Sequence, residues 1–319
     1  MSTLRSLQLP DRVRSISLKT ARGQFAVLEA QPVRGVSHRR PALLMPGYTG
    51  SKENFLPILE PLAAAGRTVV AFDQRGQYQS PHAPGRPGYA PAELAADAIA
   101  IAAAVGGDGG VHLVGHSMGG LIARQAVLTR SAQFLSLTLL GSGPGTIGGD
   151  RAAELRNALA WLDPSVGAEP DDMHALNELI RQAWHDQHEP QARAEGVDEH
   201  VIAFLKERML RTDPLHLIVL ARYLLDCADH TDELAAVVRS GLATQVVYGE
   251  NDDAWPPDVQ ADMASRLGAE RACIPGAAHS PAIEAPVTTA SILTDFWNEA
   301  ERRLPTVHSC GRSHHAKAS

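Results

Sequence analysis

Short runs of apolar or alternating residues, separated by turn residues, recur along the first half of the chain. Six of them have the length of β-strands, at 13–19, 25–30, 42–45, 68–72, 111–114 and 135–140. Arg22-Gly23 separates the first two runs, which predicts a hairpin. Helical stretches are predicted between the later runs, at 53–65, 91–105 and 121–128. Alternation of short apolar strands with helices predicts an α/β fold whose sheet is mostly parallel and covered on both faces.

The hydrophobic pattern takes on helical spacing from about residue 151 to residue 234. Leu176, Ile180 and Trp184, for example, fall on one face of an amphipathic helix. The turn signals Glu189-Pro190 and Asp213-Pro214 predict breaks between helices. An all-helical segment is therefore expected to interrupt the α/β pattern.

The α/β pattern resumes with strands predicted at 244–248 and 271–274 and a last helix over 286–303. Beyond that helix the residues are small, polar and rich in histidine, which predicts a flexible tail. The expected domains are a core of residues 1–144 and 236–304, a helical insertion at 145–235, and the tail at 305–319.

Composition narrows the class of protein. Of 319 residues, 44% are hydrophobic and 20% charged, which is typical of a globular chain, and the net charge of −7 argues against a nucleic-acid partner. Cys227, Cys273 and Cys310 are too few and too widely spaced to predict a disulfide framework or a metal site. We find neither a signal peptide nor an apolar run of membrane-spanning length, so a cytoplasmic location is expected. The sequence leaves the oligomeric state open.

One pentapeptide carries the strongest chemical signal. Gly115-His116-Ser117-Met118-Gly119 has the form G-x-S-x-G, with a predicted strand directly before it and a predicted helix directly after it. A sharp strand-to-helix turn strains the central serine and exposes its hydroxyl, and only glycines on either side leave room for that turn. Ser117 is therefore the candidate nucleophile, while a capping serine in an ordinary connection is the alternative.

A serine hydroxyl needs a base, and fourteen histidines compete for that role. His279 is the best candidate, because its loop follows the last predicted strand and so lies at the same carboxyl edge of the sheet as Ser117. His116 is interpreted as a packing or site-wall residue, and His112 as a buried structural residue of its strand. A carboxylate must orient the base, and Glu250, Asp252 and Asp253 all follow a strand at that edge, so spacing alone does not choose among them.

With these features the chain resembles the α/β-hydrolase superfamily, in particular its esterase-like, serine-nucleophile branch with a helical lid. The order Ser117, Asp252, His279 is the order these enzymes use. The resemblance implies an eight-stranded, mostly parallel sheet, with the helical insertion as the lid. The family often places its acid in a G-x-x-D-x-x-x-P pattern, which Gly249, Asp252 and Pro256 fill, and this selects Asp252.

The same resemblance implies an oxyanion hole formed by two backbone N–H groups, those of Tyr48 and Met118. Two positions depart from the family pattern. Pro46 stands where histidine is usual, and Tyr78 stands where the D-x-R-G-x-G-x-S loop usually has glycine. Because the donor at Tyr48 belongs to the backbone, these departures bear on loop shape and substrate fit.

The expected function is hydrolysis of a small-molecule acyl ester by a Ser-His-Asp triad through an acyl-enzyme, without a metal or an organic cofactor. The triad does not separate an esterase from a thioesterase, amidase, carbon–carbon hydrolase or cofactor-free peroxidase of the same fold. A non-catalytic ligand-binding protein is a further alternative from another class.

Overall fold

The computed structural model describes residues 4–33, 39–163 and 172–304. Its centre is one eight-stranded sheet with the strand order β1-β2-β4-β3-β5-β6-β7-β8. The strands are β1 (Val13–Thr20), β2 (Gly23–Ala30), β3 (Ala42–Met45), β4 (Val69–Phe72), β5 (Val111–His116), β6 (Phe134–Leu140), β7 (Ala243–Gly249) and β8 (Glu270–Ile274). Only β2 runs antiparallel to its neighbours β1 and β4. The predicted eight-stranded, mostly parallel sheet is confirmed.

Burial along the strands explains their composition. Every residue of β3, β4 and β5 is buried, because helices cover both faces of a parallel sheet. The edge strand β1 is mostly exposed and alternates apolar with polar residues instead.

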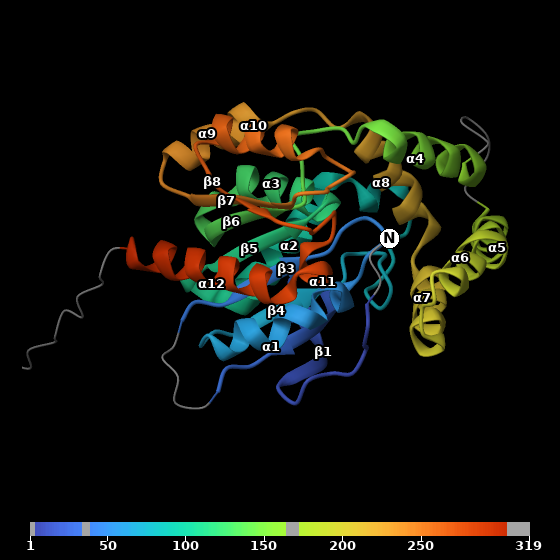
Figure 1. Cartoon of the computed structure of the whole chain (residues 1–319), viewed down its shortest axis with the longest axis horizontal. Coiled ribbons are helices and arrows are strands. Elements are labelled where there is room, and N and C mark those ends of the chain that lie inside the picture. Colours follow the sequence, from blue (N-terminus) through green and yellow to red (C-terminus); the bar gives the residue numbers. More distant parts are fainter. Residues whose placement is uncertain (1–3, 34–38, 164–171, 305–319) are drawn as a thin grey trace, which may run out of the picture.

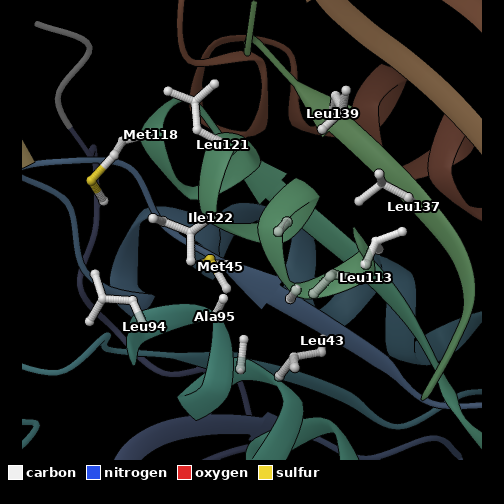
Figure 2. Close-up of a cluster of buried hydrophobic side chains, with 14 of the residues drawn as sticks. Leu43, Met45, Leu94, Ala95, Leu113, Met118, Leu121, Ile122, Leu137 and Leu139 are labelled. Atoms are coloured by element: carbon white, nitrogen blue, oxygen red, sulfur yellow. The ribbon is translucent and has the colours of Figure 1, made fainter. Parts of the chain in front are cut away.

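Helices form a layer on each face of the sheet (Figure 1). One layer holds α2 (Pro91–Gly106), α3 (Met118–Arg130), α9 (Thr231–Arg239) and α10 (Pro257–Leu267), and the other holds α1 (Leu56–Ala64), α11 (Pro281–Glu284) and α12 (Pro286–Arg302). Figure 2 shows part of the first core, to which Leu121 and Ile122 of α3 and Leu113 of β5 belong. Short 3₁₀ turns lie at Lys52–Phe55, Arg86–Tyr89, Gly107–Gly109 and Ser131–Gln133.

The remaining helices lie between β6 and β7 in sequence. They are α4 (Gly149–Leu162), α5 (Met173–Ala183), α6 (Glu189–Ala194), α7 (Glu199–Arg211) and α8 (Pro214–Asp226). Figure 1 shows α4 to α7 grouped together beside the sheet, with α8 between them and the core. Their apolar faces form two small clusters of their own, the larger of which includes Tyr89 from the core.

The predicted break at Glu189-Pro190 is wrong. The chain stays helical from Met173 to Ala194, with a π-helical turn at Trp184–His188 just before the proline. A π turn shifts the backbone hydrogen bonds by one residue, and Pro190 falls near the start of α6, where its missing N–H is tolerated.

The helical segment leaves and rejoins the core at one place. The N–H of Ile147 donates to the carbonyl of Leu224 at 2.9 Å. A Cβ added at Gly145 would lie 3.2 Å from the carbonyl oxygen of Cys227. The buried guanidinium of Arg124 donates to the carbonyls of Gly143 and Pro144. These bonds fix the segment that follows β6 on helix α3.

A buried ionic contact joins α12 to the sheet. The carboxylate of Glu301 accepts from Arg67 at 2.7 Å and lies 3.1 Å from Nε2 of His112 in β5. Burial alone would raise the pKa of Glu301, but these two partners outweigh it and hold the pKa at about 2. Glu301 is therefore ionised at neutral pH.

The predicted flexible tail, 305–319, lies outside the described residues. Of the helices that the structure describes, none has the length and hydrophobicity needed to cross a membrane.

Candidate active site

Ser117 occupies a strained turn between β5 and α3. Its backbone angles are φ 56° and ψ −126°, and Tyr78 is the only other non-glycine residue with positive φ among the described residues. Such angles are unfavourable for a side chain with a Cβ and are found where surrounding structure enforces them. Two hydrogen bonds fix the turn: the N–H of Ser117 donates to Leu140 O at 2.9 Å, and Gly120 N–H donates to Ser117 O at 2.8 Å.

The flanking glycines are needed because backbone passes close to both. A Cβ at Gly115 would lie 2.6 Å from the Cα of Gly120, and a Cβ at Gly119 would lie 2.7 Å from the carbonyl oxygen of Met45. No side chain fits at these distances. The turn around Ser117 thus requires glycine at both positions, as the pentapeptide indicated.

The structure brings His279 to Ser117. Nε2 of His279 lies 2.9 Å from the hydroxyl oxygen of Ser117, within hydrogen-bond distance. The histidine lies in the loop between β8 and α11, and this loop is held by backbone contacts, including Asn251 N–H to Ala277 O at 2.8 Å. The carboxylate of Glu284 accepts from the N–H of Ser280 at 3.1 Å, next to the histidine.

Asp252 completes a chain of hydrogen bonds. Its Oδ1 lies 3.0 Å from Nδ1 of His279. The neighbouring Asp253 instead faces the surface and pairs with Arg151 at 3.0 Å, while Glu250 accepts from the N–H of Gly276. Of the three acidic candidates, only Asp252 is placed against the histidine.

The surroundings of Asp252 keep it ionised. Burial would raise the pKa of its carboxyl, but hydrogen bonds from His279, from the N–H of Ala254 and from the Gln260 amide outweigh burial and lower it. A buried carboxylate so placed fixes the proton of His279 on Nδ1, leaving Nε2 free to accept the proton of Ser117.

Residues 46–48 pass directly against Ser117. A Cβ at Gly47 would lie 3.0 Å from the Cβ of Ser117. Met118, on the other side, is the first residue of α3, where backbone N–H groups have no partner within the helix. The N–H groups of Tyr48 and Met118 therefore belong to the two segments that border the serine.

Two glutamines orient this loop, and the sequence analysis did not identify them. The buried Gln74 donates to the carbonyl of Pro46 at 2.8 Å, and the buried Gln77 donates to that of Gly47 at 2.7 Å. Because both bonds engage carbonyls, the carbonyls of the loop are directed toward the glutamines. Both residues fill variable positions of the segment that resembles D-x-R-G-x-G-x-S, so the motif gave no signal for them.

Tyr78 is one of the two departures from the family pattern. Its φ of 35° is a conformation that favours glycine, which explains why glycine is usual at this position. Here the strained tyrosine packs edge-on against Phe204 of α7, with ring centroids 5.7 Å apart, and its N–H donates to Thr212. The loop shape is kept, and the side chain links the core to the helical segment.

Gln260 and Trp255 also lie against the Asp252–His279 pair, and the sequence analysis did not identify either of them. The amide of Gln260 donates to Oδ2 of Asp252 at 2.9 Å. The indole of Trp255 is buried beside the His279 ring, 6.2 Å between centroids, and donates to the carbonyl of Gly145 at 3.2 Å. Glutamine on an amphipathic helix gives no pattern that separates a buried partner from a surface residue.

Within residues 4–33, 39–163 and 172–304, no group of three or more His, Cys, Asp or Glu side chains could hold a metal ion. The chemistry that the described side chains themselves offer is proton transfer from a hydroxyl through an oriented imidazole.

The fold and this strand-turn-helix geometry define a class of protein. The sequence profile of the Alpha/beta hydrolase family matches residues 42–292, and the chain belongs to this family. Among solved structures, a thermophilic esterase from Thermogutta terrifontis superposes with a TM-score of 0.64 over 90% of this chain and 99% of that one. At 20% identity, this similarity shows the fold.

Two curated relatives share stretches of sequence with the chain. A Variovorax paradoxus protein named as the carbamate hydrolase RutD is 39% identical over 110 residues, which are 34% of this chain and 41% of the relative. The lipase LipV of Mycobacterium tuberculosis is 33% identical over 141 residues, or 42% of this chain and 48% of the relative. The chain thus spans less than half the length of each. Both relatives are named as hydrolases.

Proposed function

We propose that the chain is a serine hydrolase that cleaves a small-molecule acyl ester through Ser117, His279 and Asp252. The observation that carries the proposal is the continuous hydrogen-bond chain from Asp252 Oδ1 to His279 to the Ser117 hydroxyl, with heavy-atom distances of 3.0 and 2.9 Å. A hydroxyl needs such a base to act as a nucleophile at neutral pH.

The reaction proceeds in two halves. Ser117 attacks the acyl carbonyl while His279 takes its proton, and the imidazolium then donates that proton to the leaving alcohol. Water, activated by His279, next attacks the acyl-serine, and the collapse releases the acid and restores Ser117. Asp252 holds the tautomer of His279 and stabilises the imidazolium in both halves.

The backbone N–H groups of Tyr48 and Met118 are assigned to the oxyanion of the tetrahedral intermediate. The loop contact at Gly47 and the position of Met118 at the first turn of α3 support this assignment. The positive end of the helix dipole adds to the attraction. Removal of one such donor typically costs about 3 kcal/mol of transition-state stabilisation.

We propose that residues 145–235 contain the lid, with α4 to α8 as its covering part. Its contacts with Tyr48 and Tyr78, which come from Leu217 and Phe204, support this proposal. Such a cover excludes water and shapes the acyl pocket. A cytoplasmic location is part of the proposal, and the two described cysteines, Cys227 and Cys273, form no disulfide with each other.

The test is hydrolysis of p-nitrophenyl acetate and butyrate by wild type and Ser117→Ala. We expect the variant to lose at least 10³-fold in kcat/KM. A fluorophosphonate probe should label the wild type at Ser117 and leave the variant unlabelled. Equal hydrolysis by both proteins, or labelling elsewhere, would refute the assignment.

A second candidate is cleavage of a carbamate or amide C–N bond, favoured by the segment shared with the relative named as a carbamate hydrolase. The same three residues would catalyse either reaction, so only the choice of substrate distinguishes the two functions. A panel of nitrophenyl esters and N-aryl carbamates measures the ratio of kcat/KM values; a ratio in favour of the carbamates would replace the ester assignment.

A further inference from the structure

His116 makes a hydrogen bond that the proposed mechanism does not use. It is the last residue of β5, its ring is buried, and its Nε2 lies 2.8 Å from the backbone carbonyl oxygen of His279. A carbonyl oxygen only accepts, so Nε2 of His116 carries the proton and donates it. The bond therefore has one direction and requires one tautomer if the ring is neutral.

Two adjacent residues thus hold His279 at two points. His116 binds its backbone carbonyl at 2.8 Å, and Ser117 lies 2.9 Å from its side-chain Nε2. Ser117 and Asp252 bond only to the imidazole of His279, whereas His116 bonds to its backbone. This bond adds to the Asn251–Ala277 and Ser280–Glu284 bonds that hold the loop, and it comes from the residue beside Ser117.

The ring of His116 also lies against the loop of residues 46–48. A Cβ added at Gly47 would lie 3.4 Å from Nδ1 of His116. The imidazole is therefore packed between the loop that precedes Tyr48 and the loop that carries His279. One buried side chain thus lies against two of the loops that border Ser117.

We propose that His116 is a positioning residue of this hydrolase, which sets the place of His279 through a hydrogen bond to its backbone carbonyl. The inference rests on the proposed function and deepens it, because it assigns the geometry of the base to a residue outside the triad.

The charge state of His116 fits this role. Burial, and then the neighbouring His279, lower the pKa of His116 to about 4, so the ring is neutral in neutral solution. The titratable groups that act on it are His279, whose ring centroid is 5.1 Å away, and Asp252. A neutral neighbour leaves His279 free to become an imidazolium, whereas a cation at that distance would oppose it.

The test compares His116→Leu, which removes the donor, with His116→Gln, whose amide nitrogen can reproduce the donor without titrating. His112→Leu is the matched control: His112 is a buried histidine of the same strand, bonded to Ser136 and Glu301 away from the site. With p-nitrophenyl butyrate, we expect His116→Leu to lower kcat about 10- to 100-fold with little change in KM. His116→Gln should recover most of the loss, and His112→Leu should lower only the free energy of unfolding.

A second readout does not depend on catalysis. Hydrogen–deuterium exchange of the backbone amides in residues 275–281 should be faster in His116→Leu than in wild type, His116→Gln or His112→Leu. Unchanged exchange in His116→Leu would overturn the inference, and so would equal losses of kcat in His116→Leu and His112→Leu.

The two proposals fail in different ways. If the wild type neither hydrolyses esters nor reacts with a fluorophosphonate, the proposed function fails, while the exchange experiment still decides whether His116 holds the loop. If the wild type is active and His116→Leu retains full kcat and slow exchange, only the positioning role is refuted.

Discussion

The phenol of Tyr48 donates a hydrogen bond to the backbone carbonyl of Leu217 in α8, with a distance of 2.7 Å between the oxygens. Tyr48 is also the residue whose own N–H we assign to the oxyanion. Desolvation of the phenol raises its pKa well above its ordinary value, so the hydroxyl remains a donor at all physiological pH values. The side chain of Tyr48 therefore joins helix α8 to the loop of residues 46–48.

Tyr48→Phe removes this bond and keeps the ring. We expect the free energy of unfolding to fall by about 1 kcal/mol, the usual net value of one hydrogen bond. We also expect kcat to fall severalfold, since the loop is released from α8. Urea unfolding and steady-state kinetics measure the two effects. Tyr89→Phe is the control, because it removes a bond between the core and Asp213 at the start of α8 without touching the loop; equal losses of kcat in both variants would contradict the prediction.

Asp252→Asn should lower kcat by about 10⁴-fold, because an asparagine stabilises the wrong tautomer of the base. Asp253→Asn should stay within about twofold of wild type, since Asp253 is exposed and its pair with Arg151 is a surface ion pair. Initial rates with a nitrophenyl ester measure both. A large loss at Asp253 with none at Asp252 would show that the acid is the neighbouring residue.

Ser117→Gly should make the protein more stable than Ser117→Ala while both are inactive. Glycine relieves the positive φ of 56°, whereas alanine keeps the Cβ that causes the strain. We expect a difference of about 1 kcal/mol in the free energy of unfolding, after allowing for the greater freedom of glycine in the unfolded chain. Equal midpoints in urea would show that the turn stores no strain at this residue.

Glu301→Gln should destabilise the protein at pH 7 by about 3 kcal/mol, because the pKa of Glu301 is lowered to about 2 in the folded state by His112 and Arg67, despite its burial. A carboxylate with a lowered pKa stabilises the fold above its unfolded pKa of about 4.3, and this contribution is lost as the pH falls toward 2. Urea unfolding of both proteins at pH 7 and pH 3 measures the change. A difference that stays constant or grows on acidification would contradict the sign.

Much of the sheet could be predicted because its strands are buried on both faces. Apolar runs such as 42–45 and 111–114 have the length of strands and no polar face, so few other structures accommodate them. Helix α10 was not predicted, although Pro257 at its first position is a usual signal for a helix start. The prediction at Pro190 was wrong because whether a proline breaks a helix depends on its position in the helix, and the sequence does not give that position.

The candidate site could be predicted where close backbone contacts allow only particular residue types. Glycines around Ser117 reflect close backbone contacts, and the order of the loops along the chain places His279 at the same edge. Spacing did not distinguish Asp252 from Asp253, because adjacent residues differ only in the direction of their side chains. Gln74 and Gln77 act on carbonyls far away in sequence, a contact that only the fold reveals.

The closed base of the helical segment has a consequence for variation in its length. Because Ile147 bonds to Leu224 in the last turn of α8 and Gly145 lies against Cys227, the two ends of the segment meet at its base. Residues added or removed between these two ends change only the length of a segment whose ends are already joined. Such changes strain neither β6 nor β7. The sheet, with Ser117, His279 and Asp252 at its edge, can thus be combined with helical segments of different size, and the surroundings of these three residues can change while their own arrangement is kept.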